Sequence, residues 1–329
     1  MVIASDRVGG TLVECLRSLA TQEDPPAFEV LVASAVEPAP LSDRPFPFAW
    51  VAVEDRNPAL RRNRAARQAR GALLAFLDDD AQAEPDWLAA GARVLERCTI
   101  AGGPDLLPPG APYAERLSDL LLATSWIGSG VPAHERDPRG GPVRSAHDVA
   151  LCNLFVRREA FDALGGFDEA LGYISEDTDF VRRALGSGMS VELDPSVRVR
   201  HRRRRFPGEY LAQRWRYRVK TGRMLLERPG LHARGRIAVF LGGGFLASAG
   251  AALLGPAFVA PALLIYAAAT WALSFPIWRR DPLLFPAVPF AFALHHATYF
   301  VGLLVGMARG AMALLRAPRP QTAPTRSDT

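Results

Sequence analysis

Lysine is almost absent from this 329-residue sequence, since Lys220 is the only lysine among 39 basic residues. Arginine supplies the rest of the positive charge, and the net charge is +5. Cysteine is also scarce, and the three present, Cys15, Cys98 and Cys152, are odd in number and scattered. Such cysteines provide neither a disulfide framework nor the spacing of a metal site, so we expect buried thiols in a reducing compartment.

The first residues lack a basic segment followed by an apolar core, so we expect no signal peptide. A strand is predicted over residues 2–4, and a strand that begins so early leaves room for further residues upstream. The first two-thirds of the chain have the composition of a soluble protein, whereas residues 237–307 are overwhelmingly apolar. The length fits one large or two small domains.

The most informative stretch is an apolar run, residues 73–77, that ends in Asp78, Asp79 and Asp80. We predict a buried strand with the acidic triplet at its carboxyl end, because Asp disfavours strand interiors. In open α/β sheets ligands bind at that edge. Adjacent carboxylates repel one another unless a cation neutralises them, and oxygen ligands suit Mg²⁺ or Mn²⁺. The alternative is a plain acidic turn between a strand and a helix.

Strands and helices alternate along the first hundred residues. Strands are predicted at residues 2–4, 28–32, 48–53 and 73–80, and helices at 11–20, 58–70 and 85–97. This alternation predicts an α/β fold in which helices cover both faces of a mostly parallel sheet. Residues 100–144 are rich in Gly and Pro, and we predict loops around a cleft there. Further strands are predicted at 149–156, 191–193 and 197–199, and helices at 158–164 and 176–184.

An amphipathic helix is predicted over residues 210–226. It places Leu211, Trp215 and Val219 on one face with arginines around it, which is typical of a helix lying in a membrane interface. Four arginines at 202–205 precede it. We expect this run to face anionic lipid headgroups, because an apolar segment follows; nucleic acid is the alternative partner, which we do not favour.

Residues 237–275 are too long for one membrane span, at roughly 20 residues per crossing. We predict a hairpin of two helices that turns near Gly255-Pro256 and Pro261, and a third span over residues 283–307. The positive-inside rule then places the C-terminal arginines, such as Arg309, on the wrong side. Either the third segment is re-entrant or the number of spans differs. A buried soluble core is a further alternative for this tail.

Several short motifs follow one another in an order that resembles family 2 glycosyltransferases with the GT-A fold. They are Arg62-Asn63, Phe76-Leu77-Asp78-Asp79-Asp80, Pro85-Asp86-Trp87-Leu88, Gly165-Gly166-Phe167-Asp168, Ser175-Glu176-Asp177 and His201. The similarity runs from about Val2 to His201. The tail, with His296, Tyr299, Gly302 and Gly306, is similar to bacterial members of the succinoglycan type, which build exopolysaccharide units on a lipid carrier.

The resemblance implies an inverting enzyme that uses Mg²⁺ or Mn²⁺ and a nucleotide-sugar donor, expected to be a UDP-sugar. It assigns Asp78 and Asp79 to donor binding and Asp80, with Asp78, to the metal. Asp79 has the alternative of pointing into the protein, because neighbours on a strand face opposite ways. The resemblance makes Asp177 the catalytic base, beside Glu176, which we expect to point away and orient the loop. The alternative for this pair is simple complementarity to the helix dipole.

Arg62, Asn63 and His201 complete the predicted donor site. Arg62 would contact a phosphate, and His201 would contact the diphosphate or the metal, with an ordinary surface position as the alternative for each. Asn63 is expected to pin a loop. Family members carry an Asp at the end of the second strand, where this chain reads Val32-Ala33-Ser34, so the nucleotide base stays open. The contiguous Gln213-Arg214-Trp215 lacks the spacing of processive synthases, which favours single-sugar addition.

We therefore predict a GT-A domain over residues 1–205, an interfacial helix over 206–235, about three membrane helices within 236–317 and a disordered tail over 318–329. The expected reaction moves one sugar to a lipid-linked acceptor at a bacterial inner membrane, in cell-surface polysaccharide or glycolipid synthesis. The catalytic domain would be cytoplasmic, and no nucleic acid is involved. One alternative is a polyprenyl-phosphate glycosyltransferase. The other is a catalytically silent scaffold that binds sugar nucleotides, which the intact Asp80 and Asp177 argue against.

Overall fold

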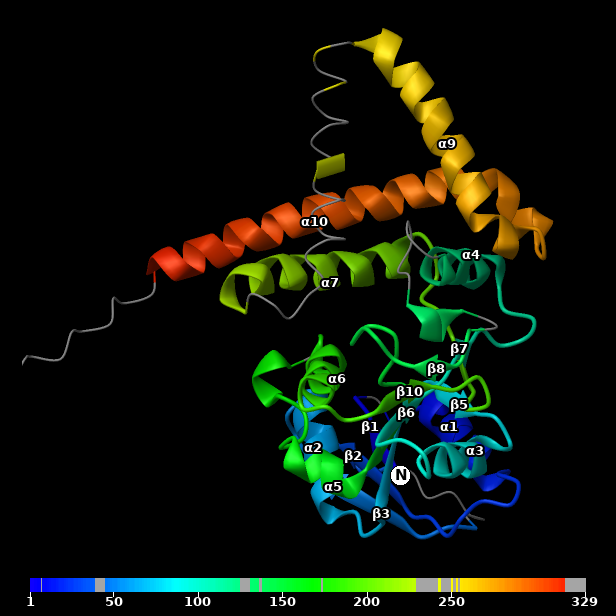
Figure 1. Ribbon diagram of the computed structural model, residues 1–329, viewed down its shortest axis with the longest axis vertical. Helices are drawn as coiled ribbons and strands as arrows, with labels where there is room; N and C mark the ends of the chain where they lie inside the picture. The colour runs from blue at the N-terminus through cyan, green and yellow to red at the C-terminus, as the bar shows by residue number, and fades with distance from the viewer. Residues whose placement is uncertain are drawn as a thin grey trace, which may run out of the picture.

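The computed structural model describes residues 1–6, 8–38, 45–124, 131–135, 138–172, 174–228, 242–243, 250, 253 and 255–316. The sheet domain, which contains the strands between Val2 and His201, occupies one end of the molecule, and the helical region, which begins at Gly208, lies across the other (Figure 1). Most of the predicted first helix of the membrane hairpin and all of residues 318–329 lie outside the described residues.

The main sheet has eight strands in the order β3-β2-β1-β4-β9-β6-β10-β8. Their bounds are β1 (Val2–Ala4), β2 (Val30–Ser34), β3 (Phe48–Ala52), β4 (Leu73–Asp78), β6 (Ile100–Gly102), β8 (Gly141–Pro142), β9 (Asn153–Arg157) and β10 (Val191–Leu193). Strands β9 and β8 run against the other six. The predicted mostly parallel sheet is therefore confirmed.

A second sheet lies beside the acidic triplet. It consists of β5 (Ala81–Ala83), β11 (Val199–His201) and β7 (Asp105–Leu106), in the order β5-β11-β7. Strand β11 pairs with β5 so that His201 lies opposite Ala81, and it pairs in parallel with β7. Three segments that are distant in the sequence thus meet at the carboxyl end of β4.

Helices cover both faces of the main sheet. These helices are α1 (Gly10–Ala20), α2 (Pro58–Gln68), α3 (Trp87–Val94), α5 (Arg158–Ala163) and α6 (Glu176–Gly186), with the short helix η2 (Glu169–Leu171) after α5. Successive side chains of β4 enter opposite cores: Leu74 and Phe76 pack with α2, α5 and α6, and Ala75 and Leu77 pack with α1 and α3. Burial on both faces explains why β4 reads as a continuous apolar run.

Residues 113–123 form a helix, α4 (Tyr113–Ala123), where the sequence predicted loops; η1 (Pro132–His134) is a second short helix in this region. Leu117, Leu120 and Leu121 recur at helical spacing and pack with Tyr210 and Phe292 of the helical region. The prediction was wrong because the dense Gly and Pro around this short helix obscured its periodicity.

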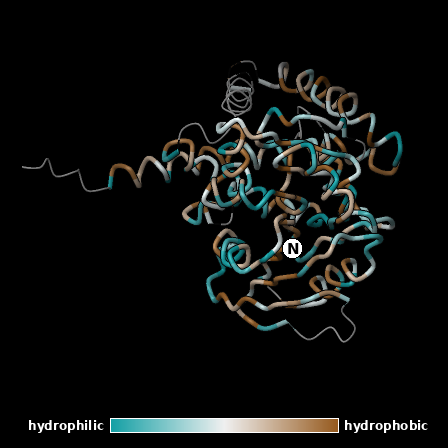
Figure 2. The backbone as a smooth tube through the Cα atoms, turned by 60° about the horizontal axis from the view of Figure 1, so that its bottom comes forward, coloured by the Kyte–Doolittle hydropathy of each residue, from teal (hydrophilic) through white to brown (hydrophobic). Residues whose placement is uncertain are grey.

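The helical region contains α7 (Gly208–Glu227), α9 (Pro256–Trp278), η3 (Pro282–Ala287) and α10 (Val288–Arg316). Gly255, with φ of 59°, marks the predicted turn before α9, but Pro261 lies inside α9 and not in a turn. Two stretches of the described chain are long and apolar enough to cross a membrane, Val259–Trp278 and Pro282–Arg316. Hydrophobic colour extends along α9, away from the sheet domain (Figure 2).

Glycines bring α7 and α10 into backbone contact. A Cβ atom on Gly306 would lie 2.1 Å from the carbonyl oxygen of Val219, and one on Gly222 would lie 2.3 Å from that of Leu303. A larger side chain at either position would push the helices apart. The glycines of the C-terminal motif therefore have a packing role in this structure.

Candidate functional site

A pocket of about 320 Å³ lies between the carboxyl edge of the sheet and α7. This volume is typical of small-molecule sites. The sheet domain contributes Arg62, Asp78, Asp105, Glu176, Asp177 and His201. Helix α7 contributes Tyr210, Gln213, Arg214, Tyr217, Arg218 and Thr221. One wall of the pocket is thus rich in carboxylates, and the other is basic and aromatic.

Arg62 joins two of the predicted acidic residues. Its Nη2 donates to Oδ1 of Asp78 at 2.7 Å, and its Nη1 donates to Oε1 of Glu176 at 3.1 Å. Glu176 is buried, and this burial, with the nearby Asp177, raises its pKa to about 7 although Arg62 acts in the opposite direction. The expectation that Glu176 points away is therefore wrong, because its carboxylate faces Arg62 at the edge of the pocket.

Asp177 lies in the first turn of α6 and lines the pocket. Its Oδ1 accepts a hydrogen bond from the backbone N–H of Thr178 at 2.6 Å. Asp179 is a different case, since its buried carboxylate is paired with Arg182 at 2.9 Å and with Arg183 at 2.7 Å. Of these two aspartates, Asp177 is the one that lines the pocket.

Asp79 and Asp80 point in different directions. Oδ1 of Asp80 lies 3.0 Å from Nε2 of His201, and Oδ2 accepts from Arg204 at 3.2 Å. Burial alone would raise the pKa of Asp80, but His201 and Arg204 outweigh it and lower the pKa to about 2. Asp79 accepts from Oγ of Ser5 at 2.6 Å, and burial raises its pKa to about 6. Asp79 is thus directed toward β1, and its contact with a donor stays a prediction.

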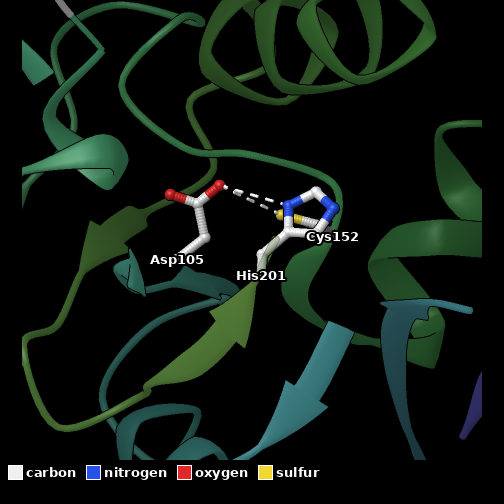
Figure 3. Close-up of side chains that lie close together, drawn as sticks. All are labelled: Asp105, Cys152 and His201. Atoms are coloured by element: carbon white, nitrogen blue, oxygen red, sulfur yellow. Dashed lines mark hydrogen bonds and ion pairs between the residues drawn. The ribbon is translucent and has the colours of Figure 1, made fainter. Parts of the chain in front are cut away.

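Asp78, Asp80 and His201 fit a divalent cation. Each offers one ligand atom, and these atoms lie within 4.8 Å of one another. The two carboxylates suit Mg²⁺ or Mn²⁺, and the imidazole adds a ligand that is typical of transition metals. His201 also belongs to a second group, with Asp105 and Cys152 (Figure 3). Burial raises the pKa of the Cys152 thiol to about 12, and a thiol suits softer metals than Mg²⁺ or Mn²⁺.

Asp105 is a buried charge that sequence reasoning missed. Its Oδ2 accepts from Nη1 of Arg203 at 3.0 Å, and its Oδ1 lies 2.8 Å from Nδ1 of His134. Burial would raise the pKa of Asp105, but Arg203 and His134 hold it well below its usual range. Arg203 also donates to Asp119 at 2.8 Å and is itself buried. The prediction that the whole run at 202–205 faces lipid is therefore wrong for Arg203.

We expect Arg203→Met to destabilise the fold strongly, because it leaves the carboxylate of Asp105 buried without its main partner. Breaking a buried ion pair costs about 3–5 kcal/mol. Arg198→Met is the matched control, since the Arg198 side chain is 46% exposed and its acidic neighbour Asp86 is 42% exposed; there we expect a change within about 0.5 kcal/mol. Thermal unfolding of the two purified variants measures the difference. Equal unfolding temperatures would contradict this role for the buried pair.

Asn63 lies outside the pocket and holds a loop. Its Nδ2 donates to the carbonyl oxygen of Phe167 at 2.8 Å, and its Oδ1 accepts from the N–H of the same residue at 2.9 Å. At the end of β2, where related enzymes carry an Asp, Oγ of Ser34 accepts from Nε1 of Trp50 at 3.1 Å. This position therefore offers a hydroxyl held by Trp50, and no carboxylate.

The sequence analysis also did not predict the basic wall of the pocket. The Arg214 guanidinium lies 4.8 Å from the ring centre of Tyr217, and that of Arg218 lies 3.9 Å from the ring centre of Tyr299 on α10. Arg214, Tyr217 and Arg218 are spaced three and four residues apart, so they share one face of α7. The spacing of these three residues is visible in the sequence. Only the tertiary structure shows that the face they share lines the pocket.

Comparisons with known proteins agree with this geometry. Succinoglycan biosynthesis protein ExoM of Rhizobium meliloti is 31% identical over 200 residues, covering 57% of this chain and 62% of ExoM. O-antigen biosynthesis protein RfbC of Myxococcus xanthus is 29% identical over 213 residues, covering 58% of this chain and 16% of RfbC. The chain thus matches less than two-thirds of the length of these relatives.

The fold is similar to that of the mannosyltransferase PcManGT of Pyrobaculum calidifontis, solved with GDP-Man and Mn²⁺. The TM-score is 0.53 at 20% identity, over 90% of this chain and 86% of that chain. The model of the family described as glycosyl transferase family group 2 matches residues 73–305, which is more than half of the chain. The chain therefore belongs to this family and is a glycosyltransferase with the GT-A fold.

Proposed function

We propose that this glycosyltransferase moves a single sugar, with inversion, from a nucleotide-sugar donor to a lipid-linked acceptor in cell-surface polysaccharide synthesis. One observation carries the proposal. The pocket that contains Asp78, Asp177 and His201 is closed on its other side by α7, the helix that packs against the apolar α10. An acceptor held at a membrane would therefore reach the carboxylates past α7. The names of ExoM and RfbC, for succinoglycan and O-antigen biosynthesis, support this class of product.

The proposed donor site lies at the carboxyl end of β4. Asp78, Asp80 and His201 would hold Mg²⁺ or Mn²⁺, which supplies positive charge to the donor's diphosphate. Arg62 keeps the carboxylate of Asp78 in place through the 2.7 Å hydrogen bond and itself lies at the edge of the pocket. The donor is proposed to be a UDP-sugar.

The proposed base is Asp177. A base must come within hydrogen-bond reach of the acceptor hydroxyl, on the side opposite the leaving diphosphate. Asp177 lines the pocket from α6, on a different element from the β4 carboxylates. Glu176 would remain bound to Arg62 and support this arrangement. The catalytic domain is proposed to lie on the cytoplasmic side of a bacterial inner membrane, where nucleotide sugars are available.

A donor screen tests the proposal. The full chain, purified in detergent with Mn²⁺, is given UDP- and GDP-sugars in turn, and nucleotide release is measured with and without a polyprenyl-diphosphate-linked sugar. We expect one donor to support release that rises at least tenfold when this acceptor is added. Equal stimulation by a bare polyprenyl phosphate would favour the polyprenyl-phosphate alternative. Donor binding without any release would favour the scaffold.

A further inference from the structure

Helices α7 and α10 lie side by side and run in the same direction. Near the N-terminal ends of the two helices, the hydroxyl oxygen of Tyr210 lies 2.8 Å from Nδ1 of His295. Further along, Gly306 meets the backbone of Val219, and Gly310 meets Arg223. Figure 1 shows α10 lying along α7 across the end of the sheet domain, with α9 directed away from that domain. The position of α7 relative to a bilayer therefore determines the position of most of α10.

Helix α7 cannot lie within a hydrocarbon core. Along the stretch that contacts α10 it carries five basic residues, Arg214, Arg216, Arg218, Lys220 and Arg223. It also forms a wall of the catalytic pocket, together with Asp78 and Asp177 of the sheet domain. Charged side chains are costly at the centre of a bilayer. Because α10 contacts α7 along this stretch, α10 lies at the same level, outside the hydrocarbon core.

The face of α10 that is turned away from α7 is apolar over its whole length. Phe290 is 64% exposed, Val301 45% and Met312 49%. These residues follow one another every 11 positions, which is about three helical turns, so they lie on nearly the same line along the helix. A contiguous apolar face of this length indicates an apolar partner.

The charges beside this face indicate which partner it is. A cavity of about 490 Å³ between α7 and η2 is lined by Arg216, Lys220, Arg223 and Arg309, with Glu227 as its acidic residue. Arg316, at the end of α10, is also exposed. An apolar outer face with arginines behind it, at the level of α7, matches an anionic bilayer surface, where the acyl chains lie on one side of the phosphate headgroups.

We propose that α10 lies flat in the membrane interface, with Phe290, Val301 and Met312 in the acyl boundary of an anionic bilayer, and that it does not cross the membrane. Its length and composition would also suit a span, but its contact with α7 excludes one. Helix α9 differs. It has no Asp, Glu, Lys or Arg, and its 23 residues extend about 34 Å. Just beyond its end, Asp281 pairs with Arg116 of the sheet domain at 3.1 Å.

This arrangement resolves the conflict with the positive-inside rule. Helix α10 contacts α7, and Asp281 just after α9 pairs with Arg116 at 3.1 Å, so the end of α9 and the whole of α10 lie on the side of the sheet domain. Arg309 and Arg316 then lie on the same side as Arg279, Arg280 and the sheet domain, as the rule requires.

Depth measurements test the proposal. Phe290→Cys, Val301→Cys and Met312→Cys are each labelled with a fluorophore in the full chain, in phosphatidylglycerol-containing vesicles, and quenched by lipids that carry bromine at known depths. The native cysteines are all buried, and a labelling reaction on the parent chain checks that they do not react with the fluorophore. We expect equal depths for the three, close to the headgroup boundary. A crossing helix would separate the outer two by about 33 Å along its axis.

Two positions on α9, Leu264→Cys and Phe275→Cys, are the control and should lie at different depths. A second readout is sidedness: Arg316→Cys should react with an impermeant maleimide from the same side as Glu96→Cys on the sheet domain. Graded depths along α10, labelling of the two sites from opposite sides, or labels on α10 that no lipid quenches would each overturn the proposal. None of these readouts depends on the donor or acceptor, so the proposal can fail while the proposed function holds.

Discussion

Asp80→Ala is expected to abolish metal-dependent donor binding. The carboxylate lies 3.0 Å from Nε2 of His201, and with Asp78 and His201 it forms the group that suits a divalent cation. Without it the cation loses one of three protein ligands, and the diphosphate loses its counter-charge. Changes to residues that merely support metal ligands cost about 10–100-fold in affinity, so loss of a ligand should cost more than about 100-fold.

Calorimetry with a nucleoside diphosphate, in Mn²⁺ and then in EDTA, measures this effect. The wild-type chain should bind more tightly in Mn²⁺, and the variant should show the same weak binding in both. Asp86→Ala is the control, since Asp86 is 42% exposed and pairs only distantly, at 3.8 Å, with Arg198. Full metal-dependent affinity in Asp80→Ala would remove Asp80 from the metal site.

Asp177→Asn should reduce turnover by roughly 10²–10⁴-fold, the usual contribution of general base catalysis. The amide keeps the shape of the side chain and can still accept the 2.6 Å hydrogen bond from Thr178, but it cannot take a proton. Donor affinity should stay nearly unchanged, because Asp177 is not in the group that suits a metal. The matched control is Asp162→Asn on the exposed surface of α5.

Turnover and donor affinity, measured together, distinguish three results. Lost turnover with intact donor binding supports Asp177 as the base. Lost donor binding would instead assign Asp177 to the nucleotide site. Unchanged turnover would reject it and leave Glu176 as the next candidate, because Asp179 is held by Arg182 and Arg183.

The sequence pattern predicted the structure correctly where that structure depends on residues close together in the chain. The apolar run that ends in three aspartates did form β4 with its carboxylates at the carboxyl edge. The scattered cysteines are buried and free, as expected. The helix at 113–123 was missed although its leucines are correctly spaced, because short helices surrounded by Gly and Pro give a weak signal.

Two contacts of the tertiary structure were not visible in the sequence. The arginine run at 202–205 reads as a uniform basic surface, yet Arg203 is buried against Asp105, which is 98 positions away. The C-terminal apolar segment reads as a membrane span, yet its glycines hold it against a charged helix. In both cases the contact joins segments that are far apart in the sequence, so the local pattern of residues cannot predict it.

By itself the sequence therefore determined the α/β class of the first two-thirds, the acidic edge of β4 and the amphipathic character of α7, because each depends on residues within about one or two turns or a single strand. Only the tertiary structure decided that Arg62 joins Asp78 to Glu176, that Asp105 and Arg203 form a buried pair, and that α7 closes the pocket. The physical reason is that charge pairing and close helix contact depend on distances in space, which chain position does not specify.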